Sequence, residues 1–371
     1  MSTRRLRQQM LSMALLSNLL ASPALWALEI TQLRLNSNHI FPDKGEALEV
    51  GFMLSEAATP TLRIYDGRDW LVREIIGEAT AGEQVLSWDG TSLLGESVPA
   101  EAYQFTISAV DPDGNTVVYD LSNASAGSDL KPTDVRWDAA QGVLEYRLSE
   151  PARVNVRVGL QNFGPLMKTV IDWFPRPAGL NTEAWDGMDQ SSVLDLRNHP
   201  SLQVEVDAFS LARNTIFVGE PPDRVQLIDG LSGANKRGAN SADLQPKRMH
   251  FHSQQPIETR GDVEISLAFL GDHPVDEDDI PILSGLVSIQ MDVPGPDRDR
   301  VLARRFEPVF YVDGAFTFEN EVGFLPFTWI WDTAKANDGI HYVTANLRGY
   351  EGNFGMATLK VRVNNAEEQN R

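Results

Sequence analysis

Two histidines near residue 250 have the spacing of a metal site. His250 and His252 lie two positions apart in a stretch predicted to be a strand, where alternate side chains project from one face. Two imidazoles on one face can bind copper or zinc, and Met249 and His273 could complete the ligand set. Alternatively, Met249 and Phe251 face the core and leave both histidines in solvent. No third ligand follows at a fixed spacing, so both interpretations stay open.

A second group of metal-binding side chains lies in the stretch 273–279. Its carboxylates belong to Asp276, Glu277, Asp278 and Asp279. Dense Asp and Glu oxygens can bind calcium and stiffen a domain junction, although a charge run of this kind is usually only solvated. Calcium is therefore the one cofactor that the sequence offers, with Asp276, Asp278 and Asp279 as candidate ligands.

A pair of aromatic residues lies beside prolines in the stretch 173–177. Trp173 and Phe174 could stack on a sugar ring or form part of a protein interface, with Tyr350 as a further contact. The other interpretation is that Trp173 ends a strand and packs inward. The first interpretation predicts a glycan or peptidoglycan ligand, and the second predicts only a core residue.

Catalytic patterns are weak in this chain. No serine lies in a Gly-x-Ser-x-Gly nucleophile elbow, and paired carboxylates for glycoside hydrolysis cannot be selected among so many acids. The sequence contains no cysteine, which excludes a thiol nucleophile, thiolate metal sites and a lipid-anchored cysteine. We therefore expect a protein that is not an enzyme.

The N-terminal segment and the net charge indicate the compartment in which the protein functions. Arg4, Arg5 and Arg7 precede an apolar run, and small residues then allow cleavage after Ala24 or Ala27. This is the pattern of a secretory signal peptide, and no other stretch has the ~20 apolar residues of a transmembrane helix. The formal net charge of −20 without a basic block disfavours nucleic acid and anionic lipid as partners. We expect a periplasmic or extracellular protein with no transmembrane segment in the mature chain.

One tripeptide recurs and organises the elements around it. It is found at Trp88-Asp89-Gly90 and Trp185-Asp186-Gly187, and a looser form is found at Trp331-Asp332. Alternating apolar and polar residues precede the first copy, which indicates a strand, and Asp-Gly favours a turn after it. The tryptophan then packs at a strand end as a core anchor.

The repeat, composition and turn signals predict an all-β chain of tandem Ig-like or fibronectin-like β-sandwiches. In the second sandwich, the alternation of Val154, Val156 and Val158 with Arg153, Asn155 and Arg157 predicts one buried and one solvated face. The expected segments are a signal peptide (1–27), sandwich 1 (28–123), a linker (124–132), sandwich 2 (133–219), a linker or long loop (220–247), sandwich 3 (248–364) and a polar tail (365–371).

The first copy resembles a known module. The residues Thr61–Gly67, Ala81-Gly82, Trp88-Asp89-Gly90, Gly95 and Val98-Pro99 are similar to the Ig-like domain of the flagellar hook-capping protein. The resemblance covers about residues 50–110 and continues more weakly over 145–210, where 195–200 replaces the Val-Pro element. The third sandwich resembles bacterial Ig-like domains generally.

The resemblance implies a β-sandwich and a scaffolding role, and it implies no catalytic residues. The secretory signal differs from the export route of the hook-capping protein, so the shared module does not make this chain flagellar. We therefore expect an exported scaffold or adaptor that binds a protein in the envelope or at the cell surface. A carbohydrate-binding module protein is the alternative.

Overall fold

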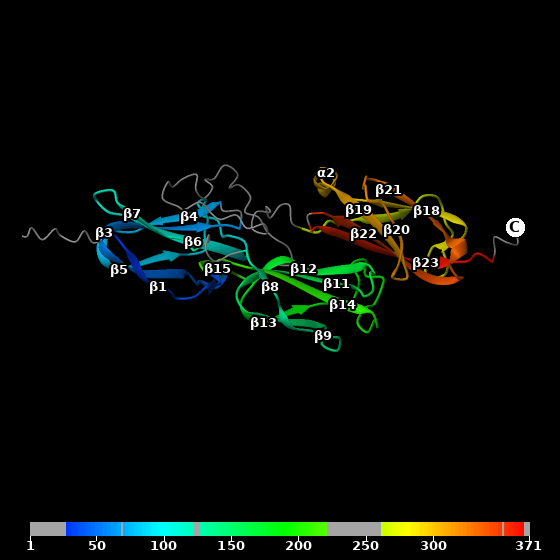
Figure 1. Ribbon diagram of the computed structural model, residues 1–371, viewed down its shortest axis with the longest axis horizontal. Coiled ribbons are helices and arrows are strands. Elements are labelled where there is room, and N and C mark those ends of the chain that lie inside the picture. Colours follow the sequence, from blue (N-terminus) through cyan, green and yellow to red (C-terminus); the bar gives the residue numbers. More distant parts are fainter. Residues whose placement is uncertain (1–26, 68–69, 122–126, 221–260, 351, 367–371) are drawn as a thin grey trace, which may run out of the picture.

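The computed structural model describes residues 27–67, 70–121, 127–220, 261–350 and 352–366, and these form three successive β-sandwiches (Figure 1). Each has its own large hydrophobic core. The all-β prediction is confirmed. Among the described residues, no helix is long and apolar enough to cross a membrane.

The first sandwich is built around one long strand that takes part in both of its layers. Residues 48–54 of β3 pair with β5, and residues 59–65 pair with β4 and β6, so the strand changes layers at the register shift between them. The strands of this sandwich are β1 (Ile30–Leu35), β2 (His39–Ile40), β3 (Leu48–Tyr65), β4 (Leu71–Ile76), β5 (Thr80–Trp88), β6 (Glu101–Val110), β7 (Thr116–Tyr119) and β15 (Thr215–Val218); η1 (Pro42–Lys44) is a 3-10 turn.

The last strand of the first sandwich comes from beyond the second sandwich. β15 pairs antiparallel with β6 and parallel with β2, and Ile216 and Val218 belong to the first core. The expected range of sandwich 2, 133–219, is therefore wrong at its end, because residues 215–218 belong to the first sandwich. The expected linker 124–132 also differs, because β8 (Asp129–Leu130) pairs with β14 in the second sandwich. The second sandwich is an insertion between β7 and β15, so the chain crosses this junction twice.

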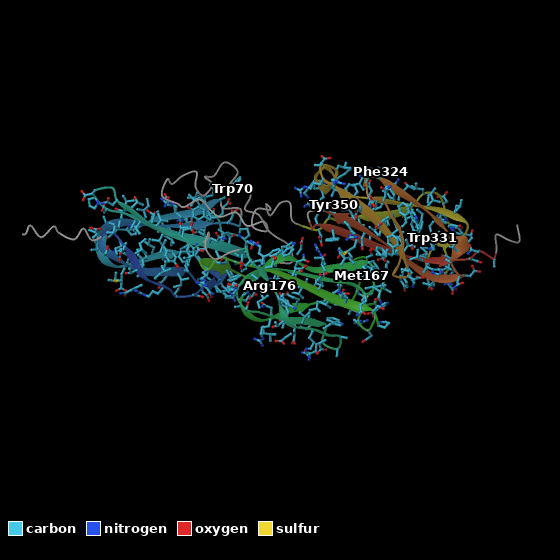
Figure 2. The ribbon with its side chains drawn as sticks, in the orientation of Figure 1. Trp70, Met167, Arg176, Phe324, Trp331 and Tyr350 are labelled. Carbon is cyan, nitrogen blue, oxygen red and sulfur yellow. The ribbon has the colours of Figure 1, made fainter. Side chains whose placement is uncertain are left out.

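The second sandwich packs the β13-β10-β9 sheet on the β12-β11-β14-β8 sheet. Its remaining strands are β9 (Thr133–Asp138), β10 (Val143–Leu148), β11 (Ala152–Leu160), β12 (Leu166–Arg176), β13 (Gly179–Ala184) and β14 (Leu202–Ser210). A buried network joins the two sheets, because Arg176 binds Glu183 through two hydrogen bonds of 2.7 and 2.8 Å and the Tyr146 hydroxyl donates to Glu183 over 2.7 Å (Figure 2 labels Arg176).

The third sandwich packs a sheet of order β16-β18-β21 on one of order β17-β23-β22-β19-β20. Its elements are β16 (Ser266–Phe269), β17 (Ile282–Leu283), β18 (Leu286–Asp292), α2 (Asp297–Leu302), β19 (Phe306–Val312), β20 (Ala315–Glu319), β21 (Phe327–Asp332), η3 (Thr333–Lys335), β22 (Gly339–Gly349) and β23 (Phe354–Val363). The core between these sheets contains Trp329, Trp331 and Phe310.

Candidate functional site

The polar face of β11 is where the three sandwiches are connected. Val154, Val156 and Val158 enter the second core as predicted, but the opposite face is not solvated. Arg153, Asn155 and Arg157 have exposed fractions of only 8, 1 and 7%. The predicted wet face is therefore wrong, because neighbouring sandwiches cover it. Charged side chains are seldom buried without partners, so their partners define the site.

Arg153 connects the second sandwich to the first. Its Nη2 lies 3.1 Å from Oε1 of Glu101, at the start of β6, and both side chains are buried. Its Nη1 donates to the backbone carbonyl of Trp173 over 3.2 Å. Removing either partner of such a pair would leave an uncompensated buried charge. The first junction is therefore held by a specific ion pair in addition to its two chain crossings.

A β-bulge in β12 shapes this polar face. Asn155 is opposite both Asp172 and Trp173, because the pairing moves from Val154–Phe174 to Val156–Ile171. Trp173 adopts a left-handed backbone with φ of 59°, which is costly for a bulky residue and is a feature of functional or tightly constrained positions. The bulge presents the Trp173 carbonyl to Arg153 and the Asp172 side chain to the third sandwich.

Arg157 makes the principal contact with the third sandwich. Its Nη2 donates to Oδ1 of Asp262 over 2.8 Å and to the carbonyl of Gly352 over 2.9 Å. Its guanidinium also lies 4.3 Å from the centre of the Phe354 ring, within the range of a cation–π contact. One buried cation thus binds two separate segments of the neighbouring sandwich.

Asp262 accepts hydrogen bonds from residues of both the second and the third sandwich. Its carboxylate accepts hydrogen bonds from Arg157, from the Thr169 hydroxyl and from the Phe354 backbone N–H. Its own backbone N–H donates to Oδ2 of Asp172 over 2.9 Å. Burial and then the neighbouring Asp262 carboxylate raise the pKa of Asp172 from its ordinary 3.8 to about 6, although Arg157 and Arg300 act in the opposite direction. The junction therefore contains one carboxyl that titrates in a mildly acidic range.

The contact extends over the outer face of the β22-β23 layer. The Asn346 amide accepts from the Leu166 N–H over 2.9 Å and donates to the Leu166 carbonyl over 2.8 Å, while the Thr358 N–H donates to Ser191 Oγ over 2.8 Å. Asn346 and Thr358 are buried although they face away from the third core. Met167 lies at the end of the second sandwich that faces the third (Figure 2). The second sandwich thus covers the outer face of β22 and β23 at these positions.

The predicted metal ligands do not converge in the described part of the chain. His250 and His252 lie outside the described residues, as does Met249. Oδ1 of Asp276 accepts the N–H groups of Asp278 and Ile280, at 2.9 and 3.0 Å, and Oδ2 is bound by Arg362 at 2.7 Å. The Arg362 side chain, with these backbone donors, lowers the pKa of Asp276. Asp276 therefore stabilises its own loop.

Asp278 and Asp279 are exposed residues of the same loop, where Asp279 adopts a left-handed φ of 60°. Within the described ranges, no group of three or more His, Cys, Asp or Glu side chains could hold a metal ion. Calcium binding at this loop stays a prediction.

The aromatic pair proposed for glycan contact is accounted for by packing. Phe174 is fully buried in the second core, so the expectation that it contacts a ligand is wrong. Trp173 stacks on Phe209 with ring centres 4.9 Å apart and nearly parallel planes, at 9°. Tyr350 is exposed, but its hydroxyl donates to Glu307 over 2.5 Å and Arg305 lies over its ring. These three residues do not form a common aromatic platform.

The first two tryptophan motifs form the same elbow. Trp88 Nε1 donates to the carbonyl of Thr91 over 2.8 Å, and Trp185 Nε1 donates to that of Met188 over 2.9 Å. In each copy the aspartate Oδ1 accepts the N–H two residues on, and Gly90 and Gly187 share a φ of 77°. The tryptophan anchors predicted from sequence are therefore buried strand ends that brace a tight turn.

In the second elbow, Leu196 makes the hydrogen bond that Val98 of the Val-Pro element makes in the first. The Val98 N–H donates to the Gly90 carbonyl over 2.9 Å, and the Leu196 N–H donates to the Gly187 carbonyl over 2.7 Å. Both side chains are buried. At the third motif Trp331 is also buried, and Asp332 Oδ1 again accepts the N–H two residues on, from Ala334. The third motif differs because Thr333 replaces the glycine and begins the 3-10 turn η3, which Asp332 caps.

The first sandwich matches the FlgD Ig-like domain over residues 37–113. The resemblance stated from the sequence is confirmed for this region. The strand β15 lies outside the matched range and completes the first sandwich from a distant part of the chain. No curated protein matches the sequence.

Solved structures of modular proteins are also similar. The fibronectin(III)-like modules of Clostridium thermocellum CbhA align with 10% identity and a TM-score of 0.20, covering 91% of this chain and 96% of that one. A bacterial ice-binding adhesin aligns with 10% identity and a TM-score of 0.18, covering 91% and 99%. A tandem repeat from a large adhesion protein gives 15% identity, a TM-score of 0.19 and coverage of 90% and 74%. At these scores the fold assignment rests on the sheets and cores described above.

Sequence reasoning missed the residues that join the sandwiches. Glu101, Arg157 and Asp262 lie in different sandwiches and have no local motif. The only available signal was the regular placement of Arg153 and Arg157 on a strand whose other face is apolar. That pattern is shared by every solvated sheet face, so it could not indicate burial.

Proposed function

We propose that this protein is a non-enzymatic exported adaptor that binds a protein partner in the cell envelope or at the cell surface. In this proposal the polar face of β11 fixes the spacing of the three sandwiches, so that surfaces of different sandwiches are presented together. The observation that carries the proposal is the burial of Arg153 and Arg157 against partners in two other sandwiches.

The physical argument concerns the cost of such junctions. Burying a guanidinium costs several kcal/mol unless a carboxylate and further hydrogen bonds compensate it. A flexible string of sandwiches would need only a polar linker. Junctions that require matched charges on three sandwiches are useful where the relative positions of the sandwiches matter. The signal-like segment 1–27 supports export, and the overall negative charge makes nucleic acid an unsuitable partner.

The test is affinity capture with the full mature protein from an envelope extract, followed by mass spectrometry, with and without a chelator. We expect one protein to be retained in stoichiometric amount. The variant Arg157→Ala should reduce its retention, because it loosens the second junction. Arg147→Ala is the matched control, since Arg147 forms an exposed pair with Asp134.

Two results would count against the proposal. Retention of glycan in place of protein would favour the carbohydrate-binding alternative. Retention of no stoichiometric protein at all would contradict the adaptor function directly. Loss of the partner in chelator would identify a metal-dependent contact and would make the acidic loop 273–279 its first candidate.

A further inference from the structure

One edge of the third sandwich is unpaired in the described structure. β20 is the terminal strand of its sheet and pairs only with β19 among the described strands. The chain continues beside β19 after β20 ends, because Asn320 N–H donates to the Pro308 carbonyl over 3.0 Å and Gly323 N–H donates to the Phe306 carbonyl over 2.8 Å. The edge therefore runs from Ala315 to Gly323. Unpaired edges of this kind can accept an added strand.

Large apolar side chains are exposed along this edge. Phe316, Val322 and Phe324 have exposed fractions of 53, 72 and 53%. By contrast, Phe318 packs against the third core. Phe324 lies on the outside of the third sandwich in Figure 2. Exposed apolar groups gathered beside an unpaired edge favour an interaction surface over a purely solvated one.

The second sandwich contacts the turn that leads into this edge. The β11–β12 hairpin reaches the β19–β20 turn, where a Cβ atom on Gly314 would lie 2.8 Å from Leu160 Cδ1. At the tip of that hairpin, Phe163 is 96% exposed and has a left-handed φ of 62°. A bulky residue in this conformation is costly, and such outliers are concentrated at functional positions.

The charges along the edge indicate its occupant. Glu319 and Glu321 are both exposed. Glu319 pairs with Val309 and Phe316 pairs with Tyr311, so Glu319 and Phe316 lie on the same outer face of the sheet. Arg348 belongs to β22, which is separated from β20 by β19. The chain as a whole carries a net charge of −20. Carboxylates placed in this way repel a second copy of the same acidic edge and attract lysine or arginine side chains.

We propose that the edge from Ala315 to Gly323, together with Phe163, is a docking site for an extended cationic segment of a partner protein, added as a strand beside β20. This inference rests on the proposed adaptor function and specifies its contact surface. Backbone hydrogen bonds to β20 would give affinity. Lysine or arginine side chains on one face of the segment would pair with Glu319 and Glu321 and cover Phe316 and Phe163 with their methylene stems. The apolar side chains on its other face would pack beside Phe318 at the border of the third core.

The direct test uses a synthetic peptide of about ten residues that alternates valine with lysine, a length suited to a strand. Fluorescence anisotropy would measure its binding to the full mature protein, with an alternating valine–glutamate peptide as the control. We expect the lysine peptide alone to bind. The double variant Glu319→Lys/Glu321→Lys should weaken it about tenfold or more. The matched control Glu78→Lys/Glu96→Lys changes the net charge equally on the first sandwich and should leave affinity nearly unchanged.

Two further variants separate strand addition from a general charge effect. Phe163→Ala should weaken the lysine peptide without changing the charge, and Thr317→Pro should abolish binding by disrupting the edge while calorimetry checks that the third sandwich still melts cooperatively. Equal weakening by both charge-reversed pairs would overturn the proposal, as would binding that is indifferent to both Phe163→Ala and Thr317→Pro. Self-association through this edge in sedimentation would also contradict it.

Capture of a natural partner distinguishes this inference from the adaptor function. If the wild-type protein and the Glu319→Lys/Glu321→Lys variant retain the same partner equally, the docking site is wrong and the adaptor function stands. If the wild-type protein retains no partner, the adaptor function fails whatever the peptide does.

Discussion

The backbone N–H of Asp262 donates to Oδ2 of Asp172 over 2.9 Å, so carboxyl side chains of the second and third sandwiches meet at a buried junction. Arg157 compensates Asp262 directly, and it acts on Asp172 only as a neighbouring charge, as does Arg300. Burial therefore dominates at Asp172 and favours its neutral form. The second junction should therefore be more stable in mild acid, where Asp172 is protonated, than at neutral pH.

The first prediction is that stability falls as pH rises from about 4 to about 6. The folded pKa of Asp172 is about 6 and the ordinary value is 3.8, so the folded protein keeps a proton that the unfolded chain releases in this window. The free energy of unfolding should decrease across it by up to about 3 kcal/mol from this group. Calorimetry of Asp172→Asn should show a flatter pH dependence and a higher melting temperature at neutral pH than the wild type. An unchanged slope would contradict the assignment.

The second prediction concerns the ion pair of the first junction. Glu101→Ala should destabilise the protein by about 3–5 kcal/mol, because it leaves Arg153 buried without its carboxylate. The double variant Arg153→Met/Glu101→Met should recover much of that loss, since no buried charge remains. Thermal unfolding of the three proteins measures this. A double variant less stable than Glu101→Ala would show that the pair is not the cause.

The third prediction separates backbone strain from steric clash at the elbow. Gly90 and Gly95 have φ of 77° and 78°, but a Cβ atom would lie 2.3 Å from Pro42 Cγ at Gly90 and would meet nothing within 4 Å at Gly95. Gly95→Ala should cost about 1–2 kcal/mol for the left-handed backbone alone. Gly90→Ala should cost a further 1–3 kcal/mol or so for overpacking. Equal melting temperatures for the two variants would exclude the clash.

The fourth prediction addresses the acidic loop. Asp276→Ala should lower the melting temperature by the same amount in millimolar calcium and in chelator, because Arg362 and two backbone N–H groups already occupy its carboxylate. Differential scanning fluorimetry in both buffers provides the measurement. A larger loss in calcium would show that Asp276 is a ligand after all.

Local pattern was enough to predict the sandwiches and their tryptophan anchors. The alternation around Val154, Val156 and Val158 specifies strands and a core face, and Trp-Asp-Gly specifies a turn, whatever lies nearby. The sequence showed that the second copy lacks the Val-Pro element of the first. It could not show that the backbone N–H groups of Val98 and Leu196 make the same hydrogen bond, because different side chains can share one backbone geometry.

Long-range pairing explains what the sequence could not indicate. The residue types of Thr215–Val218 favour a strand but do not say which sheet it joins. Its pairing with β6 places it in the first sandwich. Glu101 and Asp262 are ordinary surface residues by type, and they become buried only when Arg153 and Arg157 reach them. The glycan candidates were selected by residue type, which does not determine convergence in space.

Pulsed electron spin resonance can show whether the polar face of β11 holds the three sandwiches at fixed positions. The chain has no cysteine, so spin labels on cysteines introduced at the exposed residues Val85, Leu180 and Ile330 would be unambiguous. The label pairs 85/180 and 180/330 should each give one narrow distance distribution, and Arg157→Ala should broaden the second pair while leaving the first narrow. Broad distributions for both pairs in the unaltered background would mean that the sandwiches are not held at fixed positions.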